Sequence, residues 1–483
     1  MDQTVKADVC CSVKDAGGGN YDLAVIGAGS AGFSAAITAA DEGARVVLIG
    51  HGTIGGTCVN VGCVPSKALI RAAETLHVAH AADRFDGIEA SARVTDWQAT
   101  VRQKQDLVDG LRKAKYSDVL KNYNSVSYLE GEAVFSDNGK LTVNGNAIDA
   151  KKIIIATGAR PAMPSIEGIE TVPYLTSTTA LELETLPASL LVIGAGYIGV
   201  EIAQMFARAG VTVTIISRRG LLPEAEPEIG EALTRYFEDE GITLVSGISY
   251  ERIETRGDSI VLTVQDEIGI REITSEKVLV ATGRTPNTEH LNLASAGIEL
   301  TAKNGVKVDA QMRTTRENVY AAGDVTGQDQ FVYMAAYGAR IAAKHAMTGN
   351  SPSYDNSAMP AVVFTDPQVA SVGLTEAQAK QRGFEVRTSV LTLDNVPRAL
   401  AARDTRGLIK LIADGKTKKL IGAHILAPEG SNSIQTAVLA IKMGMTYEDL
   451  GATIFPYLTT VEGLKLAAQT FDMDVKMLSC CAG

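Results

Sequence analysis

The residues of this chain best suited to chemistry are Cys58 and Cys63, in a run of small residues that ends at Lys67. Five residues of ideal helix rise by about 7.5 Å, whereas the Cα atoms of a disulfide rarely lie more than about 7 Å apart. Pairing these cysteines therefore requires an irregular turn, which Pro65 favours because it has no backbone N–H to donate. Such close spacing predicts a redox pair, and the alternative is two unrelated buried thiols.

A second kind of cysteine pair stands at the end of the chain, where Cys480 and Cys481 are adjacent. The Cα atoms of adjacent residues are about 3.8 Å apart, below the usual range for a disulfide, so the two thiols resist oxidation. Two neighbouring thiolates favour a soft metal ion. Cys10 and Cys11 repeat the pattern near the N-terminus, where an inert pair in an unstructured tail is an equally good interpretation.

The segment before the redox pair predicts a βαβ unit that binds a dinucleotide. An apolar strand is expected over Tyr21–Ile26, then a helix to about residue 43 and a second strand over residues 45–49. Glycines at the turn allow the backbone to approach a pyrophosphate at the helix N-terminus. These are Gly27, Gly29 and Gly32.

The same fingerprint recurs 167 residues later. Strands are expected over residues 190–193 and 211–216, with a helix to about residue 209 between them. The glycines of this second turn are Gly194, Gly196 and Gly199. One such motif is weak evidence, but two in matching settings predict two nucleotide sites.

Neither second strand is followed by the acidic residue that usually binds a ribose. Gly50 and His51 stand after the first, and Ser217, Arg218 and Arg219 after the second. Two guanidinium groups suit a 2′-phosphate, so the second site is expected to take NADPH rather than NADH. A solvated loop is the alternative for the arginines.

Length and composition bound the class of protein. With 483 residues, the chain suggests about three domains. A net charge of −11 argues against nucleic acid or an anionic membrane surface as a partner. The 18 uncharged residues 23–40 are long enough to span a membrane, but the glycines of the fingerprint explain them better. No secretory signal is seen, so the cytoplasm is the expected compartment.

Taken together, the motifs resemble the FAD-dependent pyridine nucleotide–disulfide oxidoreductases. The resemblance covers about residues 20–483 and rests on GGTCVNVGCVPSK, the two glycine fingerprints, ATGRTPN at 281–287 and AAGD at 321–324. It implies an α/β fold with two Rossmann-like dinucleotide-binding domains and an α+β C-terminal dimerisation domain. The implied division is a tail at 1–20, an FAD domain at 21–160 and 285–355, an NADPH domain at 161–284, a dimerisation domain at 356–472 and a cysteine tail at 473–483.

The resemblance also implies roles for single residues. Cys63 would face the flavin and Cys58 would exchange thiols, while Lys67, paired with Glu201, would lie near the reactive nitrogen of the flavin. Asp324 would bind the ribityl chain. Further FAD contacts would fall on Gly52, Thr57, Ala133, Gly158 and Val332, and NADPH contacts on Glu201, Ser217 and Gly283 besides the fingerprint glycines and the two arginines.

Residues 455–462 decide the expected branch of the family. Disulfide reductases carry a histidine five residues before a glutamate there, because the leaving thiolate needs a proton. Here Tyr457 precedes Glu462, and a phenol with a pKa near 10 is a poor proton donor at neutral pH. Together with the tail, this resembles the branch that reduces Hg(II), in which Tyr457 and Tyr197 would position or release the metal.

The expected protein is therefore a homodimeric enzyme that uses NADPH and FAD and takes Hg(II), delivered as a thiol complex, as substrate. Cys480 and Cys481 of the partner subunit would hand the metal to Cys58 and Cys63, so that the active sites lie at the subunit interface. Two alternatives stay open. One is a general dithiol or lipoamide oxidoreductase, and the other is a scavenger that binds soft metals without turnover.

Overall fold

The computed structural model describes residues 20–478, which form two compact units. The first contains the described residues up to Ser66 together with residues 102–162 and 284–355. The second contains residues 67–101, residues 163–283 and the described residues from Asn356 onward. Each unit is built around its own parallel sheet, and each is considered by itself.

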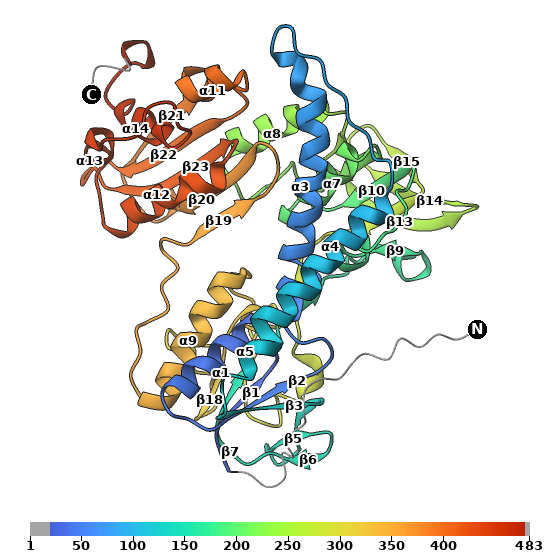
Figure 1. Ribbon diagram of the computed structural model, residues 1–483, viewed down its shortest axis with the longest axis vertical. Helices are drawn as coiled ribbons and strands as arrows, with labels where there is room; N and C mark the ends of the chain where they lie inside the picture. Colours follow the sequence, from blue (N-terminus) through green and yellow to red (C-terminus); the bar gives the residue numbers. More distant parts are fainter. Residues whose placement is uncertain (1–19, 479–483) are drawn as a thin grey trace. The chain divides into compact units, whose positions relative to one another are not determined.

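The first unit is centred on a five-stranded parallel sheet in the order β18-β7-β1-β2-β3. Its central strands are continuous apolar runs, as expected for strands buried on both faces. Helices α1 and α9 cover one face, and the small antiparallel sheet β4-β5-β6 contributes to the core on the other (Figure 1).

The elements of the first unit are β1 (Tyr21–Ile26), α1 (Ser30–Asp41), β2 (Val46–Gly50), α2 (Gly56–Asn60), the π-helical turn η2 (Lys113–Ser117), α5 (Asp118–Leu120), β3 (Val126–Glu130), β4 (Ala133–Phe135), β5 (Leu141–Val143), β6 (Asn146–Ala147), β7 (Ala150–Ile155), β8 (Ala159–Pro161), β17 (Arg284–Pro286), η4 (Glu289–Leu291), β18 (Val319–Ala321), η5 (Asp324–Thr326) and α9 (Val332–Thr348). Two longer helices, α3 (Cys63–His80) and α4 (Trp97–Arg112), contain residues assigned to both units.

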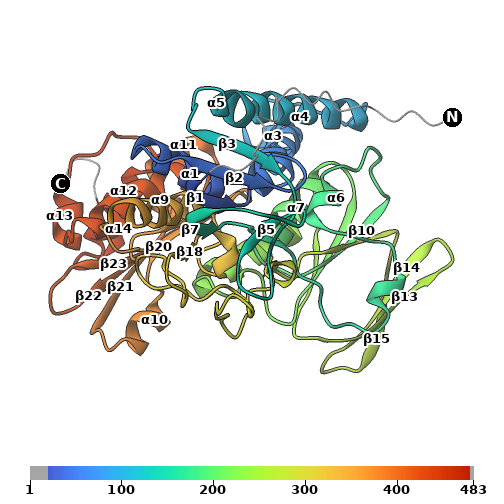
Figure 2. The ribbon, with the colours of Figure 1, turned by 90° about the horizontal axis from the view of Figure 1, so that it is seen from below.

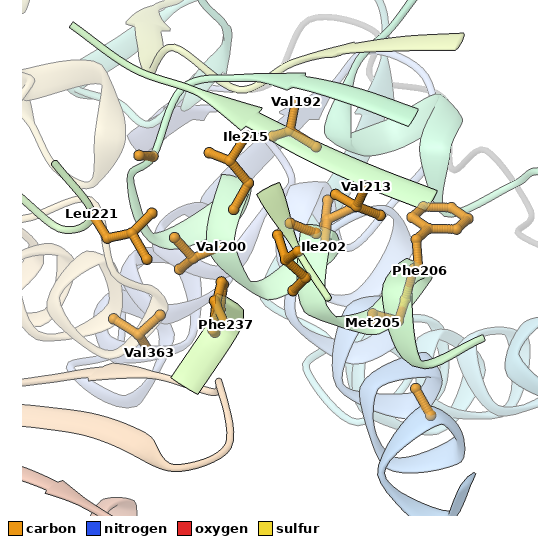
Figure 3. Close-up of a cluster of buried hydrophobic side chains, with 14 of the residues drawn as sticks. Val192, Val200, Ile202, Met205, Phe206, Val213, Ile215, Leu221, Phe237 and Val363 are labelled. Carbon is orange, nitrogen blue, oxygen red and sulfur yellow. The ribbon is translucent and has the colours of Figure 1, made fainter. Parts of the chain in front are cut away.

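The second unit repeats the parallel arrangement with the strand order β12-β11-β10-β16-β9. Helix α7 packs on this sheet through the side chains drawn in Figure 3, among them Val200, Ile202 and Phe206. The second unit also contains the antiparallel sheet β13-β14-β15 (Figure 2), and Ile253 and Leu262 from it join a separate core cluster.

The same unit contains an antiparallel sheet in the order β19-β20-β23-β22-β21. Helices α12 and α14 pack against it around Ile409, Ile434 and Leu464. All seven residues of β22 are buried, including Lys410, which is unusual for a charged side chain.

The elements of the second unit are η1 (Ala81–Arg84), η3 (Ile169–Thr171), β9 (Tyr174–Leu175), α6 (Ser177–Ala180), β10 (Ser189–Ile193), α7 (Tyr197–Arg208), β11 (Thr212–Ile216), α8 (Pro227–Asp239), β12 (Thr243–Val245), β13 (Ser249–Arg256), β14 (Ser259–Gln265), β15 (Ile270–Ser275), β16 (Lys277–Val280), β19 (Pro360–Val363), β20 (Gln368–Gly373), α10 (Glu376–Gln381), β21 (Val386–Thr392), η6 (Leu393–Asn395), α11 (Pro397–Ala402), β22 (Leu408–Asp414), β23 (Leu420–Ala427), α12 (Gly430–Lys442), α13 (Tyr447–Ala452), α14 (Glu462–Gln469) and η7 (Val475–Met477).

The predicted α/β class and both strand–turn–helix–strand units are confirmed. The apolar run over residues 23–40 is divided by its glycine turn into β1 and α1. Among residues 20–478, no helix is long and apolar enough to cross a membrane. The division into an FAD, an NADPH and a dimerisation domain stays a prediction.

Candidate functional site

The predicted redox cysteines lie on two successive helices. Cys58 is in α2, which ends before Val61, and Cys63 is the first residue of α3. Gly62 lies in the break, where an added Cβ would stand 3.4 Å from the Cys58 Cα atom. The interval is therefore the irregular turn that pairing requires. Cys63 is exposed and Cys58 half-buried, and the N-terminal end of the α3 dipole favours a thiolate at Cys63.

The turn between the two helices explains why the sequence can make this break. Val61 has a φ of −139° and ends α2. A Cβ added to Gly62 would stand 3.0 Å from the Thr57 carbonyl oxygen, so a glycine fits this close approach best. Pro65 falls in the first turn of α3, where its missing N–H leaves no hydrogen bond unmade.

An ion pair from the last stretch of the first unit lies near Cys63. Arg284 Nε is 3.6 Å from Asp324 Oδ2, and the guanidinium also donates to the Ala159 carbonyl. Burial raises the pKa of the Asp324 carboxyl, which the positive charge of Arg284 partly offsets. Burial lowers the pKa of Arg284, while negative charge at Asp324 and then at Cys63 opposes that change. Asp324 and Cys63 therefore both act on the charge of Arg284.

Tyr116 is a site residue that sequence reasoning missed. Its hydroxyl lies 3.2 Å from Ser30 Oγ, at the start of α1, and its ring meets Phe33 edge-on at 4.8 Å between centroids. Burial raises the pKa of Tyr116, the bond to Ser30 opposes the rise, and negative charge at Cys58 and Cys63 adds to it. The local feature at Tyr116 is a π-helical turn, which lies between α4 and α5 and is of a kind that often marks functional positions.

The first glycine fingerprint fits a dinucleotide. Gly27 has a φ of +118°, and a Cβ added to it would stand 2.1 Å from the Ala156 carbonyl oxygen. Gly29 is the N-cap of α1 and provides no side-chain cap, so the first N–H groups of the helix remain available to a pyrophosphate. These features match what FAD needs here, although Gly50 stands where the ribose-binding acid is usual.

The remaining residues predicted to contact FAD lie in the same unit, apart from Lys67. Gly52 follows β2, Thr57 is in α2, Ala133 begins β4, Gly158 lies between β7 and β8, and Val332 begins α9. The Gly158 carbonyl accepts a hydrogen bond from Asn287 N at 2.9 Å, which ties the β7 turn to the segment that follows β17.

The second fingerprint fits a nicotinamide dinucleotide in the same way. Gly194 has a φ of +113°, and Gly196 caps α7 without a side-chain hydrogen bond. No atom lies within 4 Å of a Cβ built on Gly196, so the backbone there is open to a ligand. Tyr197 is the first residue of α7, and burial followed by the charge of Glu224 raises its pKa.

The arginines expected to bind a 2′-phosphate follow β11. Ser217 is buried and accepts a hydrogen bond from Arg219 N at 3.2 Å, which holds the turn. Both arginines are exposed, and Arg219 Nη2 lies 2.8 Å from Glu224 Oε1. Gly283, also expected near NADPH, has a φ of +122° just after β16.

The expected pairing of Lys67 with Glu201 is present. Lys67 Nζ lies 2.6 Å from Glu201 Oε2 and 4.8 Å from the centre of the Phe364 ring. Glu201 is buried in α7, and its other oxygen accepts a hydrogen bond from Phe364 N at 2.8 Å. With both oxygens engaged by protein, Glu201 orients Lys67, and these three residues line a cavity of about 370 Å³.

Tyr457 lies on an exposed turn that Glu462 organises. Glu462 Oε2 accepts the Leu458 N–H at 3.1 Å, and Leu458 has a φ of +62°. Thr459 Oγ1 donates to the Pro456 carbonyl at 2.8 Å. The buried carboxylate of Glu462 therefore holds the backbone next to Tyr457, whose side chain is 55% exposed.

The two tail cysteines of the predicted site, Cys480 and Cys481, lie outside the described residues. Cys10 and Cys11, for which an inert pair was an open interpretation, lie outside them as well. The described chain ends at Leu478, just after η7.

One cluster of carboxylates in the second unit has the spacing of a metal site, formed by Glu226, Glu228 and Glu376. Lys410 Nζ lies at its centre, 2.8, 2.7 and 2.8 Å from the three groups in that order. The ammonium group makes these contacts in place of a metal ion. Burial lowers the pKa of Lys410, but the hydrogen bonds to the three carboxylates outweigh burial and raise it overall.

Two dinucleotide cradles and a cysteine pair in one chain suit the transfer of electron pairs from a nicotinamide through a flavin to sulfur, and the comparisons agree with this. Residues 21–343 match the family described as pyridine nucleotide-disulphide oxidoreductase, and residues 359–468 match its dimerisation domain. The chain belongs to the pyridine nucleotide-disulphide oxidoreductase family. FAD and a nicotinamide dinucleotide are its cofactors, and the dimerisation domain supports a homodimer.

Within this family, the chain is similar to mercuric reductases. It is 49% identical to the mercuric reductase of Lysinibacillus sphaericus over 468 residues, which are 96% of this chain and 85% of the relative. It is 46% identical to that of Streptomyces lividans, covering 96% of this chain and 98% of the relative. Among solved structures, it resembles the HOCl-induced flavoprotein disulfide reductase RclA from Escherichia coli in complex with Cu(II), with a TM-score of 0.83, 32% identity and coverage of 94% and 100% of the two chains.

Proposed function

We propose that this protein reduces Hg(II) to elemental mercury with electrons from NADPH, using FAD and the Cys58–Cys63 pair. The observation that carries the proposal is a cysteine pair at the start of a helix, in a chain 46–49% identical to seven mercuric reductases over nearly its whole length. When bound, FAD would take hydride equivalents from NADPH and supply electron pairs, one to open the Cys58–Cys63 disulfide and a second to reduce the metal.

The chain's own residues prepare the cysteine pair for this work. The α3 dipole favours the thiolate of Cys63, and the exposed position of that residue suits contact with a bound group. Asp324 would bind the ribityl chain. Lys67, fixed by Glu201, would supply positive charge toward the flavin.

Transfer of the metal replaces one thiolate by another at each step. Cys480 and Cys481 of the partner subunit would take Hg(II) from its small thiol carriers, and Cys58 and Cys63 would displace them in turn. The two thiolates hold Hg(II) until an electron pair converts it to Hg(0), so the balance is NADPH + Hg(II) → NADP⁺ + H⁺ + Hg(0). Soft thiolates suit this ion, and exchange between them avoids a free metal ion.

Two tyrosines would assist the transfer of the metal. Tyr457, on its exposed turn, and Tyr197, at the start of α7, would position or release the metal. We place this chemistry at the interface of a homodimer and in the cytoplasm, where thiol carriers of Hg(II) are abundant.

The test is an assay of NADPH oxidation by the purified flavoprotein with Hg(II) in excess thiol. We expect oxidation to depend on Hg(II) and to match the loss of volatile mercury one to one. Cys58→Ala and Cys63→Ala should each abolish it. Oxidation without loss of mercury would contradict the proposal.

A general disulfide reductase is the second candidate, favoured by the structural similarity to RclA. Lipoamide, glutathione disulfide and Cu(II) should therefore be assayed in parallel. Faster turnover of any of them than of Hg(II) would favour that alternative. A protein that binds Hg(II) but carries no flavin would instead be a scavenger.

A further inference from the structure

The adenosine end of the first dinucleotide site lacks its usual carboxylate. In fingerprints of this type, an acidic side chain at the end of the second strand binds the ribose hydroxyls. Here that position is Gly50, the last residue of β2. The site otherwise fits FAD, with its glycine turn and uncapped α1 N-terminus, so β2 leaves the ribose without a carboxylate.

Gly50 cannot recover a side chain without rearrangement. A Cβ added there would stand 2.4 Å from the Tyr128 hydroxyl oxygen and 2.9 Å from the Ala28 Cβ. Contacts of that length are well inside van der Waals separation. The Tyr128 hydroxyl, on the adjacent strand β3, occupies the space that a side chain at position 50 would need.

The nearest carboxylate in register is on β3 itself. Strands β2 and β3 are parallel, and Glu130 is the partner of Gly50. Beyond this pair, Gly131 N donates to the Gly50 carbonyl at 2.8 Å, so the two strand ends are fixed to each other. Glu130 is therefore held one strand away from the vacant acid position.

Strand alternation puts Glu130 on the required face of the sheet. Leu48 and Tyr128 contribute to the core cluster that contains α1, whereas Ile49 and Leu129 contribute to the cluster on the opposite face. Since side chains alternate, residue 130 returns to the face of α1 and its glycine turn. Its side chain is exposed, and within residues 20–478 no cation forms an ion pair with its carboxylate.

We propose that Glu130 on β3 replaces the missing acid of β2 and binds the ribose hydroxyls of the adenosine half of FAD. The carboxylate would thus come from the neighbouring strand, while the Tyr128 hydroxyl occupies the space beside Gly50. This assignment does not depend on the metal that the enzyme reduces.

The test measures cofactor affinity in the full-length flavoprotein rather than turnover. Diluted holoenzyme releases FAD, whose fluorescence rises, and this gives a dissociation constant. We expect Glu130→Gln to raise the dissociation constant of FAD by about 10- to 100-fold, as for the loss of a charged hydrogen bond. Glu42→Gln, in an exposed residue at the other end of α1, is the matched control and should change nothing.

A competition experiment tests the atom that is recognised. Holoenzyme is equilibrated with the FAD analogue that lacks the adenosine 2′-hydroxyl, and the bound flavins are separated and quantified. The natural protein should prefer FAD, and Glu130→Gln should lose most of that preference, while Glu130→Asp should keep part of it. No preference in the natural protein, or the same preference in Glu130→Gln, would overturn the proposal. If Glu130→Gln does not fold, the natural protein and Glu130→Asp still decide it.

Discussion

Arg219 is held by a carboxylate of its own chain before any cofactor arrives. It pairs with Glu224 at 2.8 Å, and both side chains are largely exposed. An exposed ion pair contributes only about 0–1 kcal/mol, so a phosphate dianion can displace Glu224 readily. The pairing is thus compatible with a 2′-phosphate site and does not by itself favour the alternative of a solvated loop.

Replacing Arg218 and Arg219 together by Gln should raise the KM for NADPH about 10²- to 10⁴-fold and leave that for NADH nearly unchanged, because each of the two lost charged hydrogen bonds contributes about 1.5–3 kcal/mol. Glu224→Gln is the matched variant, and it should lower the KM for NADPH slightly by removing a competitor for Arg219. Steady-state kinetics with both nucleotides measure this. Equal effects on NADPH and NADH would contradict the assignment.

Tyr457 distinguishes metal reduction from disulfide reduction. Tyr457→His introduces a group that can donate a proton near pH 7, so we expect a gain in glutathione disulfide or lipoamide reduction of up to about 10²-fold. Turnover of Hg(II) should fall in the same variant. Tyr457→Phe should lose turnover of Hg(II) without any gain on disulfides, and unchanged mercury kinetics in both variants would make Tyr457 a spectator.

At the scale of elements, one buried cation joins a strand to two helices. Lys410 on β22 meets Glu226 and Glu228 at the start of α8 and Glu376 at the start of α10. Negative charge at a helix N-terminus is favourable, so the helix dipoles stabilise these carboxylates in addition to the lysine. The hydrogen bonds from Lys380 first and Lys410 second lower the pKa of Glu376.

Lys410→Met should destabilise the protein by about 3–5 kcal/mol, because it leaves the buried carboxylate of Glu226 and two partly exposed carboxylates without their cation. Lys418→Met is the matched control. Lys418 makes an exposed pair with Glu448, and its loss should change stability by about 0–1 kcal/mol. Urea denaturation followed by circular dichroism compares them. A similar shift for both variants would show that burial adds nothing to the Lys410 contacts.

The same elements show what the sequence could predict. The β1–α1–β2 unit was predictable because strand, glycine turn and helix are local patterns, and the observed β1 coincides with the predicted strand. Tyr116 was not predictable, because it is placed at the site by a contact with Ser30 and by the electrostatic influence of the two cysteines, all of which are 50 or more residues away. Lys410 was equally hidden, since a lysine in a strand normally indicates a solvent-facing position.

For the whole molecule, the central prediction concerns two subunits. If Cys480 and Cys481 serve the partner's Cys58 and Cys63, replacing both tail cysteines by Ala should leave NADPH reduction of the redox pair intact. Turnover of thiol-complexed Hg(II) should fall sharply, whereas a small halide complex should still be reduced. Flavin absorbance and mercury release measure the two steps separately.

Hybrid dimers provide the decisive version of that experiment. A Cys58→Ala subunit combined with a tail-variant subunit should restore about one working site per heterodimer, because the intact tail and the intact pair then meet across the interface. Each parent homodimer is the control. Heterodimers that form but show no recovery would place the tail's action within its own chain.

The first compact unit is assembled from three separated stretches, and this has a consequence during synthesis. Its sheet is completed only when β18 pairs with β7, and Val319 emerges 164 positions after Ile155. At about 5–20 residues per second, the ribosome needs roughly 10–30 s to cover that interval. The strands β9, β10, β11, β12 and β16 emerge entirely within it, so their sheet can form while β7 still has an open edge. An unpaired edge is a template for wrong pairing, so the nascent chain is vulnerable to aggregation until β18 is translated and pairs with β7.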